Sequence, residues 1–190
     1  MARRILVLVT ATVVSSRSEG TLSDDVEELG ETMLLRCTGC KLIAKTMYEG
    51  IDSKLAKGFK TMTGEERLQE TAKRLVRACR KLDDMQIAQM GRGSDTMYAD
   101  FAEAMQKGGT LSGVRMMPEF SKQFRRLCVR IINEEGSALI ERMSASLKGK
   151  KKRRLLDFKM TDHVCIDMLG ACEAHGKATG DDHDDDDREL

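Results

Sequence analysis

TGEERLQETAKRLVRACRKL, residues 63–82, contains the clearest helix signal in the chain. Thr63 and Glu66 have the spacing of a capping box, in which each side chain accepts a hydrogen bond from the other residue's backbone N–H. The apolar residues that follow recur at intervals of three and four: Leu68, Ala72, Leu75, Cys79 and Leu82. This spacing predicts an amphipathic helix whose apolar face packs against other helices.

The rest of the chain has a composition that favours helices. Its 190 residues include one Pro, no Trp, two Tyr and thirteen Met, and strand signals are scarce. We therefore expect an all-α protein of two small helical bundles joined by a short Gly-containing linker, Met90-Gly91-Arg92-Gly93-Ser94. The expected units are an N-terminal helical domain (1–90), a C-terminal helical domain (94–176) and a disordered acidic tail (177–190).

Two helix boundaries follow from residue types in the C-terminal half. Ser94 is placed to cap a helix that runs through Tyr98 and Phe101 to Met105. Pro118 is placed to begin another helix, and we expect Gly136-Ser137 to end or kink it.

The N-terminus has two interpretations. Met1-Ala2-Arg3-Arg4 followed by the apolar run Ile5 to Val14 has the pattern of a secretory signal, residues 1–16, and the run is too short to span a bilayer. Against secretion, six Cys in 190 residues are few for a disulfide scaffold, and Asn133, the only Asn, begins no glycosylation sequon. We therefore expect an intracellular protein with mostly reduced thiols, in which residues 4–14 form a buried strand or helix.

The cysteines suggest no metal centre. Cys37-Thr38-Gly39-Cys40 has the spacing of a redox pair or of half a zinc site, but both thiols lie on the apolar face of a predicted helix. His163, Cys165, Cys172 and His175 cluster near the end of the chain, yet a regular helix cannot direct all four to one ion. We expect these cysteines to be core residues and expect no metal.

Three basic stripes are expected on the surface. They lie on a short helix from Ile51 to Lys60, on the outer faces of the helix after Thr63, and on the helix that begins at Pro118. The residues assigned to binding of an anionic membrane or RNA are Lys54, Lys57, Lys60, Lys73, Arg77, Arg80, Lys81, Lys122, Arg125, Arg126 and Arg130. Helix cations commonly just face water, so the stripes form one surface only if the fold brings them together.

The charge distribution is strongly asymmetric. The last ten residues contain seven acids and one Arg, so the overall net charge of +1 leaves about +7 on residues 1–180. The densest basic run, Lys148-Gly149-Lys150-Lys151-Lys152-Arg153-Arg154, must be exposed, and a nuclear-import signal is our first interpretation of it. The import residues are Lys148, Lys150, Lys151, Lys152, Arg153 and Arg154. The acidic tail is either solubilising or a competitor for the basic surfaces.

Catalysis finds no support in the sequence. There is no nucleophile elbow, no dinucleotide fingerprint and no phosphate-loop order, and aromatic residues are too few for a base-stacking platform. We expect no catalytic residue, no cofactor and no small-molecule substrate.

The plan of the chain has a known counterpart. Predicted helical bundles, Met-rich cores, basic surfaces, Arg80-Lys81-Leu82 within a basic helix, and a late helix from His163 to Cys172 before a polar tail occur together here. In these respects nearly the whole chain resembles the matrix proteins of orthomyxoviruses, in particular the isavirus branch that infects fish. The dense run at Lys148 to Arg154 and the acidic tail depart from that family, whose best-known basic cluster lies mid-chain.

The resemblance implies a non-enzymatic viral structural protein. It would self-assemble under the virion envelope, bind anionic lipid, and bridge to the viral ribonucleoprotein, its RNA and a nuclear export adaptor. Its expected locations are the virion and the host cytoplasm, nucleus and plasma membrane. Two alternatives remain open: a nucleic-acid-binding regulator or nucleoprotein, and a secreted helical modulator with residues 1–16 as its signal peptide.

Overall fold

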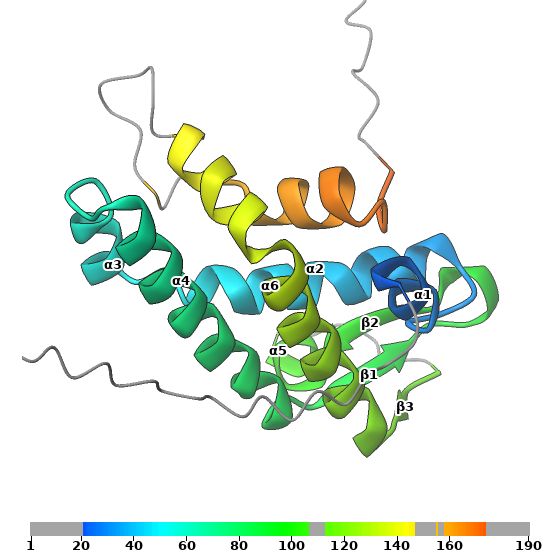
Figure 1. Ribbon diagram of the computed structural model, residues 1–190. Coiled ribbons are helices and arrows are strands. Elements are labelled where there is room, and N and C mark those ends of the chain that lie inside the picture. The colour runs from blue at the N-terminus through cyan, green and yellow to red at the C-terminus, as the bar shows by residue number, and fades with distance from the viewer. Residues whose placement is uncertain (1–20, 107–112, 147–154, 156–157, 174–190) are drawn as a thin grey trace, which may run out of the picture.

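The computed structural model describes residues 21–106, 113–146, 155 and 158–173 (Figure 1). This part of the chain is mostly helical, as expected, and it also contains a small three-stranded sheet that the all-α prediction missed. The elements in chain order are α1 (Leu22–Glu27), α2 (Met33–Glu49), α3 (Ser53–Gly58), α4 (Gly64–Cys79), η1 (Arg80–Asp83), β1 (Ile87–Met90), η2 (Gly93–Asp95), β2 (Met97–Asp100), α5 (Phe101–Gln106), β3 (Arg115–Met116), α6 (Pro118–Ser146) and the π-helix η4 (Asp162–Met168).

α4 is the helix that the capping box predicts. The Thr63 hydroxyl accepts from the Glu66 backbone N–H, and the Glu66 carboxylate accepts from the Thr63 N–H at 2.8 Å. Leu75 and Cys79 are fully buried, which confirms the predicted apolar face in the second half of the helix. Leu68 is an exception, because it is 39% exposed near the start of α4.

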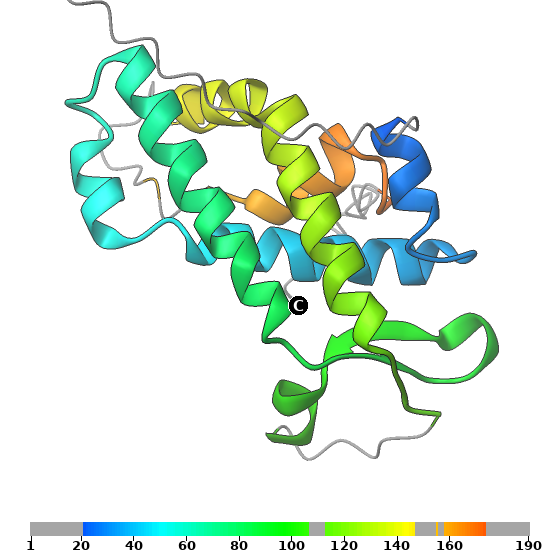
Figure 2. The same cartoon turned by 60° about the horizontal axis from the view of Figure 1, so that its bottom comes forward.

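α6 crosses the molecule as one helix from Pro118 to Ser146. Gly136-Ser137 therefore does not end the helix, although Figure 2 shows that its last turns run in a different direction from its first turns. The buried side of α6 includes Phe120, Phe124 and Leu127, and these residues pack against α2, α4 and β2.

The predicted linker is the turn of a β-hairpin. β1 pairs with β2 in antiparallel register from Ile87 opposite Asp100 to Met90 opposite Met97, and β3 pairs with the other edge of β1. Gly91 and Gly93 have φ values of 105° and 58°, which a glycine adopts without steric cost. The helix expected from Ser94 is wrong as a result, since helix α5 begins only at Phe101.

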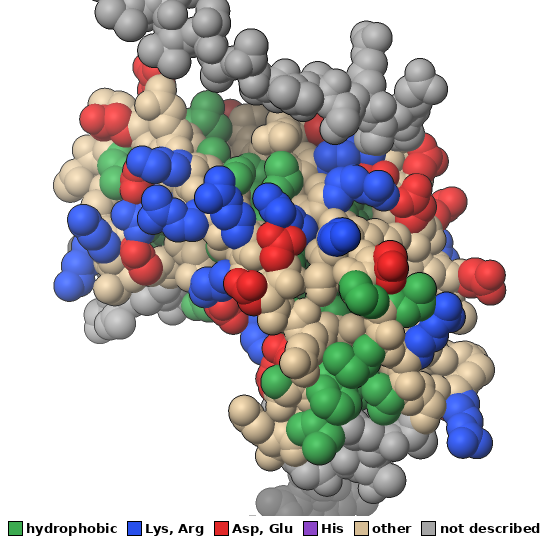
Figure 3. All heavy atoms as spheres, turned by 90° about the horizontal axis from the view of Figure 1, so that it is seen from below, with side chains coloured by type: hydrophobic (Ala, Val, Ile, Leu, Met, Phe, Trp, Pro, Cys, Tyr) green, Lys and Arg blue, Asp and Glu red, His purple; other side chains and the backbone are tan. Residues whose placement is uncertain are grey.

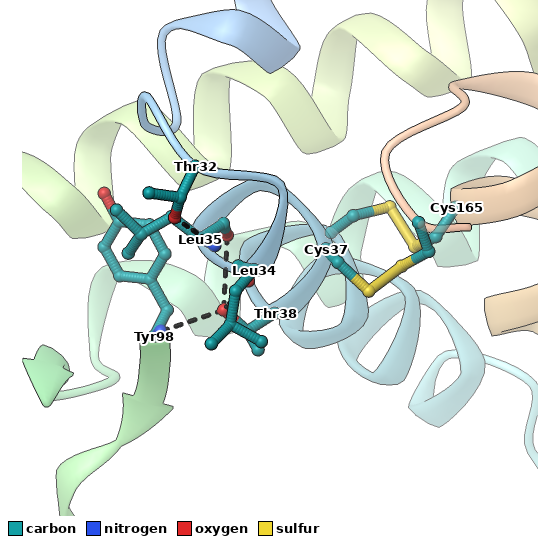
Figure 4. Close-up of a disulfide and its surroundings, with 9 residues drawn as sticks. Thr32, Leu34, Leu35, Cys37, Thr38, Tyr98 and Cys165 are labelled. Carbon is teal, nitrogen blue, oxygen red and sulfur yellow. Dashed lines mark hydrogen bonds between the residues drawn. A yellow bond between two sulfur atoms is a disulfide. The ribbon is translucent and has the colours of Figure 1, made fainter. Parts of the chain in front are cut away.

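Tyr98 connects the sheet to the helices through hydrogen bonds and ring contacts (Figure 4). Its backbone N–H donates to the Thr38 hydroxyl at 2.9 Å, and its phenol donates to the Leu29 carbonyl at 2.7 Å. Its ring meets Phe120 and Phe124 edge-to-face, with centroids 5.3 and 4.9 Å apart. A polar strand residue thus becomes part of the core because each of its donors has a partner.

One apolar cluster includes residues of both expected domains. It contains Ile43 and Met47 of α2, Leu75 of α4, Leu127 of α6 and Val164 of η4. The division into two separate helical bundles is therefore not confirmed.

All six cysteines form disulfides, so the expectation of reduced thiols is wrong for this structure. Two of the bonds join α2 to the C-terminal segment and one joins the end of α4 to α6: Cys37–Cys172, Cys40–Cys165 and Cys79–Cys128. Five of the six cysteines lie in the core, as predicted, and Cys37 is partly buried against it. The reason is that the apolar face of α2 packs directly against the segment that contains Cys165. The three bonds are nested in the sequence: the first cysteine pairs with the sixth, the second with the fifth and the third with the fourth.

The described residues contain no helix that is both long enough and apolar enough to cross a membrane. Predictions about residues 1–16 and 4–14, about Lys148 to Arg154 and about the acidic tail 177–190 lie outside the described residues.

Candidate functional site: the basic face of α4 and α6

The outward side of α4 presents three exposed cations. Lys73, Arg77 and Arg80 lie on the side opposite Leu75 and Cys79, because residues about two apart in a helix face away from each other. Arg80 belongs to η1, which continues the direction of α4. The outward side of this helix and its 3-10 extension therefore exposes Lys73, Arg77 and Arg80 to solvent.

α6 places a second stripe beside the first. α4 and α6 pack against each other and are bonded through Cys79 and Cys128. Lys122, Arg125 and Arg126 of α6 are exposed. Seen from below, Lys and Arg side chains form a band across the molecule (Figure 3). We call the exposed cations of these two helices, Lys73, Arg77, Arg80, Lys122, Arg125 and Arg126, the basic face.

Several of the predicted binding residues are engaged in ion pairs within the protein. Arg125 lies 2.7 Å from Asp83, Arg126 lies 2.6 Å from Glu28, and Lys81 lies 3.0 Å from Glu49. Arg130 is the extreme case, because it contacts both Asp25 and Glu134 and only 15% of its side chain is exposed. The hydrogen bond with Glu134, together with the charge of Asp25, raises the pKa of Arg130.

Arg130 is therefore mostly buried and engaged within the protein, so the predicted stripe from Lys122 to Arg130 is only partly exposed. By contrast, no ion pair with another described residue engages Lys73, Arg77, Arg80 or Lys122. These four cations can interact with an external anion without first breaking an ion pair with another described residue.

The α3 cations adjoin the same region at its other end. Lys54, Lys57 and Lys60 are exposed, and α3 lies beside the start of α4 (Figure 1). Arg74 lowers the pKa of Glu70 through a hydrogen bond, and the charges of Lys73 and Lys54 lower it further, so Lys54 and Lys73 lie near one acid. The fold thus brings the first stripe next to the second.

The described residues contain no group of three or more His, Cys, Asp or Glu placed to hold a metal ion. Cys165 and Cys172 are disulfide-bonded, and His163 stacks on Phe158 and lies 3.0 Å from the Asp167 carboxylate. His175, the fourth residue of that cluster, lies outside the described residues.

An open groove of about 370 Å³ lies between α2 and the β2–α5 segment. Its walls include Thr38, Lys45, Tyr98 and Glu103, and Lys45 forms an ion pair with Glu103 at 2.5 Å. That hydrogen bond raises the pKa of Lys45. The groove has no nucleophile beside a base, so the basic face is the better candidate site.

Comparison of the chain with family models, with curated proteins and with solved structures finds no match. The functional argument therefore depends on the residues of this chain. Sequence reasoning missed the disulfide pairing, for which the even number of cysteines and the signal-like N-terminus were the available indications.

Proposed function

We propose that this protein is a non-catalytic binding protein of the secretory pathway that uses its basic face to bind anionic partners. The pairing of all six cysteines carries the proposal, because disulfides persist in oxidising compartments and are rare where glutathione keeps thiols reduced. The signal-like residues 1–16 support the same compartment. This function develops the secreted alternative of the sequence analysis.

Expression in cells with an epitope tag inserted after residue 20 tests the compartment and leaves both ends intact. We expect the N-terminal segment to be removed near residue 16 and no free thiol to react with an alkylating reagent. Six alkylated thiols together with an intact Met1 would overturn the proposal.

The binding role has its own test. The protein should be retained on a heparin column, used as a generic polyanion, and elute earlier as Lys73→Gln/Arg77→Gln/Arg80→Gln. Arg125→Gln/Arg126→Gln is the control, and it removes two charges where the first variant removes three. Its elution should shift less for each charge removed, because Arg125 and Arg126 already pair with Asp83 and Glu28. An equal shift for each charge removed would contradict the assignment of polyanion binding to Lys73, Arg77 and Arg80.

The resemblance to orthomyxovirus-type matrix proteins supports a second proposal. Here the basic face would bind anionic lipid, and a self-assembled layer under the virion envelope would multiply contacts of about 1 kcal/mol per cation. The layer would bridge to the viral ribonucleoprotein and a nuclear export adaptor, with Lys148 to Arg154 as the import signal. We place it second because such assembly on the cytosolic side would meet reducing conditions.

Liposomes test the matrix function, and the compartment test above separates it from the first proposal. The matrix function requires sedimentation with phosphatidylserine vesicles, loss of binding at raised salt, and little binding to neutral vesicles. Preference for RNA over these vesicles in competition would instead favour a nucleic-acid-binding regulator.

A further inference from the structure

We propose that the outer face of the three-stranded sheet is a docking site for an extended, apolar segment of another polypeptide that also carries acidic residues. This surface is separate from the basic face, so the inference does not rest on the function proposed above.

The strand register determines which residues share this face. Ala88 lies opposite Ala99 of β2 and opposite Met116 of β3, and Met90 lies opposite Met97. Because opposite residues and alternate residues point to the same side of a sheet, these five side chains form one surface. We call it the methionine face. The other side of the sheet contains Tyr98, which is buried against the helices.

The methionine face is apolar, and its accessible part lies on β2 and β3, because Ala88 and Met90 of β1 are only 0% and 9% exposed. Met97 is 42% exposed and Met116 is 47% exposed, while Val114, two residues before Met116, is 39% exposed. Figure 3 shows hydrophobic side chains gathered on the projecting part of the molecule that contains the sheet, below the band of cations. Grouped exposed apolar residues mark interaction sites more often than scattered ones.

The accessible part of the face consists mainly of methionine side chains. The two small residues, Ala88 and Ala99, are adjacent, and Met90, Met97 and Met116 surround them. Methionine side chains are flexible and polarizable, so they can adapt to different apolar side chains. This suits recognition of a residue class such as Val, Ile or Leu within varied sequences.

The edge of the sheet favours an extended segment. The strand order β2-β1-β3 leaves β2 and β3 at the two edges. β2 is fixed to α2 through the hydrogen bond from the Tyr98 N–H to Thr38, whereas β3 pairs with β1 alone among the described residues. A partner strand that pairs with β3 would place alternate side chains beside Met116.

The charges near β3 favour acidic residues in the partner. Arg92 and Arg115 are exposed, and neither forms an ion pair with another described residue. Gly113, just before β3, packs so closely on the hairpin turn that a Cβ there would lie 2.2 Å from the Gly91 carbonyl oxygen. Arg92 therefore lies beside the start of β3, and Asp95 of the turn offsets part of its charge. Arg115, one residue before Met116, points to the Tyr98 side of the sheet. A strand paired with β3 would place every second side chain on that side, within reach of Arg115.

Fluorescence anisotropy with defined peptides tests the proposal. The probe is a fluorescein-labelled peptide of about ten residues, close to the length of a long strand, in which Val alternates with Glu, and its counterpart has Lys in place of Glu. We expect the Glu peptide to bind more tightly, and we expect Met97→Ser/Met116→Ser to weaken its binding about tenfold. Leu68→Ser is the matched control, because Leu68 is 39% exposed and belongs to the first turns of α4. The start of α4 lies far from the strands (Figure 1).

Both methionines are exposed, so circular dichroism should show that the double variant folds like the original protein. Equal affinity for the Glu and Lys peptides, or equal weakening by Leu68→Ser, would overturn the proposal. So would sedimentation of a dimer that Met97→Ser/Met116→Ser dissociates, because a second copy would then occupy the face. Peptide binding that appears only after removal of residues 181–190 would make the acidic tail the occupant and would also overturn it.

Discussion

Arg130 of α6 and Asp25 of α1 form an ion pair with little access to water. The guanidinium Nη1 lies 2.5 Å from the carboxylate Oδ2, and the two side chains are only 15% and 7% exposed. Arg130 also lies 2.7 Å from Glu134 through Nε. The pair holds α1 against α6, and it turns a residue of a basic stripe into a structural residue.

Replacing Arg130 by Ala should lower the free energy of unfolding by about 3 kcal/mol, because the substitution leaves the buried Asp25 carboxylate without its counter-ion. Arg126→Ala is the matched control: its pair with Glu28 is 55% and 54% exposed, and its loss should cost less than about 1 kcal/mol. Urea unfolding with the disulfides intact measures both values. Equal losses would contradict the structural role of Arg130.

The same pair shows what the sequence could not reveal. Spacing alone placed Lys122, Arg126 and Arg130 on one side of α6, and helical periodicity does predict that much. It does not predict that α1, about 100 residues earlier, lies where its acids neutralise part of the stripe. Which cations are available for a partner therefore depends on long-range packing.

The helices and the sheet differ in whether a single stretch of sequence is enough to predict them. α4 was predictable because its capping box and apolar spacing lie within one stretch, so local and tertiary preferences agree. The hairpin was missed because each of its strands has only four residues and Gly91-Arg92-Gly93 reads equally well as a linker. The disulfides were missed because cysteines on an apolar helix face look the same whether reduced or paired.

The Cys79–Cys128 bond gives a second prediction. It closes a loop of 49 residues between α4 and α6, and its removal increases the entropy of the unfolded chain. Cys79→Ser/Cys128→Ser should therefore lower the free energy of unfolding by about 2–4 kcal/mol. Replacing both cysteines avoids a free thiol that would exchange with the other bonds. Unfolding in urea at equilibrium checks the value, and unchanged stability would argue that this bond is absent in solution.

Acid should destabilise the protein through its helix caps. Backbone and side-chain hydrogen bonds from Thr63 lower the pKa of Glu66, a hydrogen bond from the Leu55 N–H lowers the pKa of Asp52, and a hydrogen bond from Arg74 lowers the pKa of Glu70. A carboxylate whose pKa is lowered by folding stabilises the protein above its unfolded pKa and stops doing so as pH falls through its folded pKa.

We therefore expect a melting temperature that is nearly constant between about pH 5 and pH 7 and that falls below about pH 4, where these groups titrate in the unfolded chain. Glu66→Gln should reduce the size of this fall. Thermal unfolding followed by circular dichroism across that pH range measures the effect. A fall that begins already between pH 7 and pH 5 would point to other groups.

Two helical glycines give a prediction with opposite signs. A Cβ at Gly39 of α2 would lie 3.2 Å from Leu29, 3.2 Å from Phe124 and 3.3 Å from Tyr98. These neighbours are almost completely buried, and Tyr98 is fixed by its hydrogen bond to Leu29, so none of them can move away easily. Gly39→Ala should therefore destabilise the protein by about 1–2 kcal/mol, because the overpacking exceeds the gain in helix propensity.

Gly136 of α6 is the matched control, because a Cβ there would meet only Ile132, at an ordinary contact distance of 3.6 Å. Gly136→Ala should stabilise the protein by up to about 1 kcal/mol, since alanine loses less backbone entropy in a helix than glycine does. Urea unfolding of the two single variants gives the comparison. If both substitutions raised the stability, the packing of Leu29, Phe124 and Tyr98 around Gly39 would be looser than the structure shows. Opposite signs would show that these neighbours do not move to make room for a methyl group at Gly39.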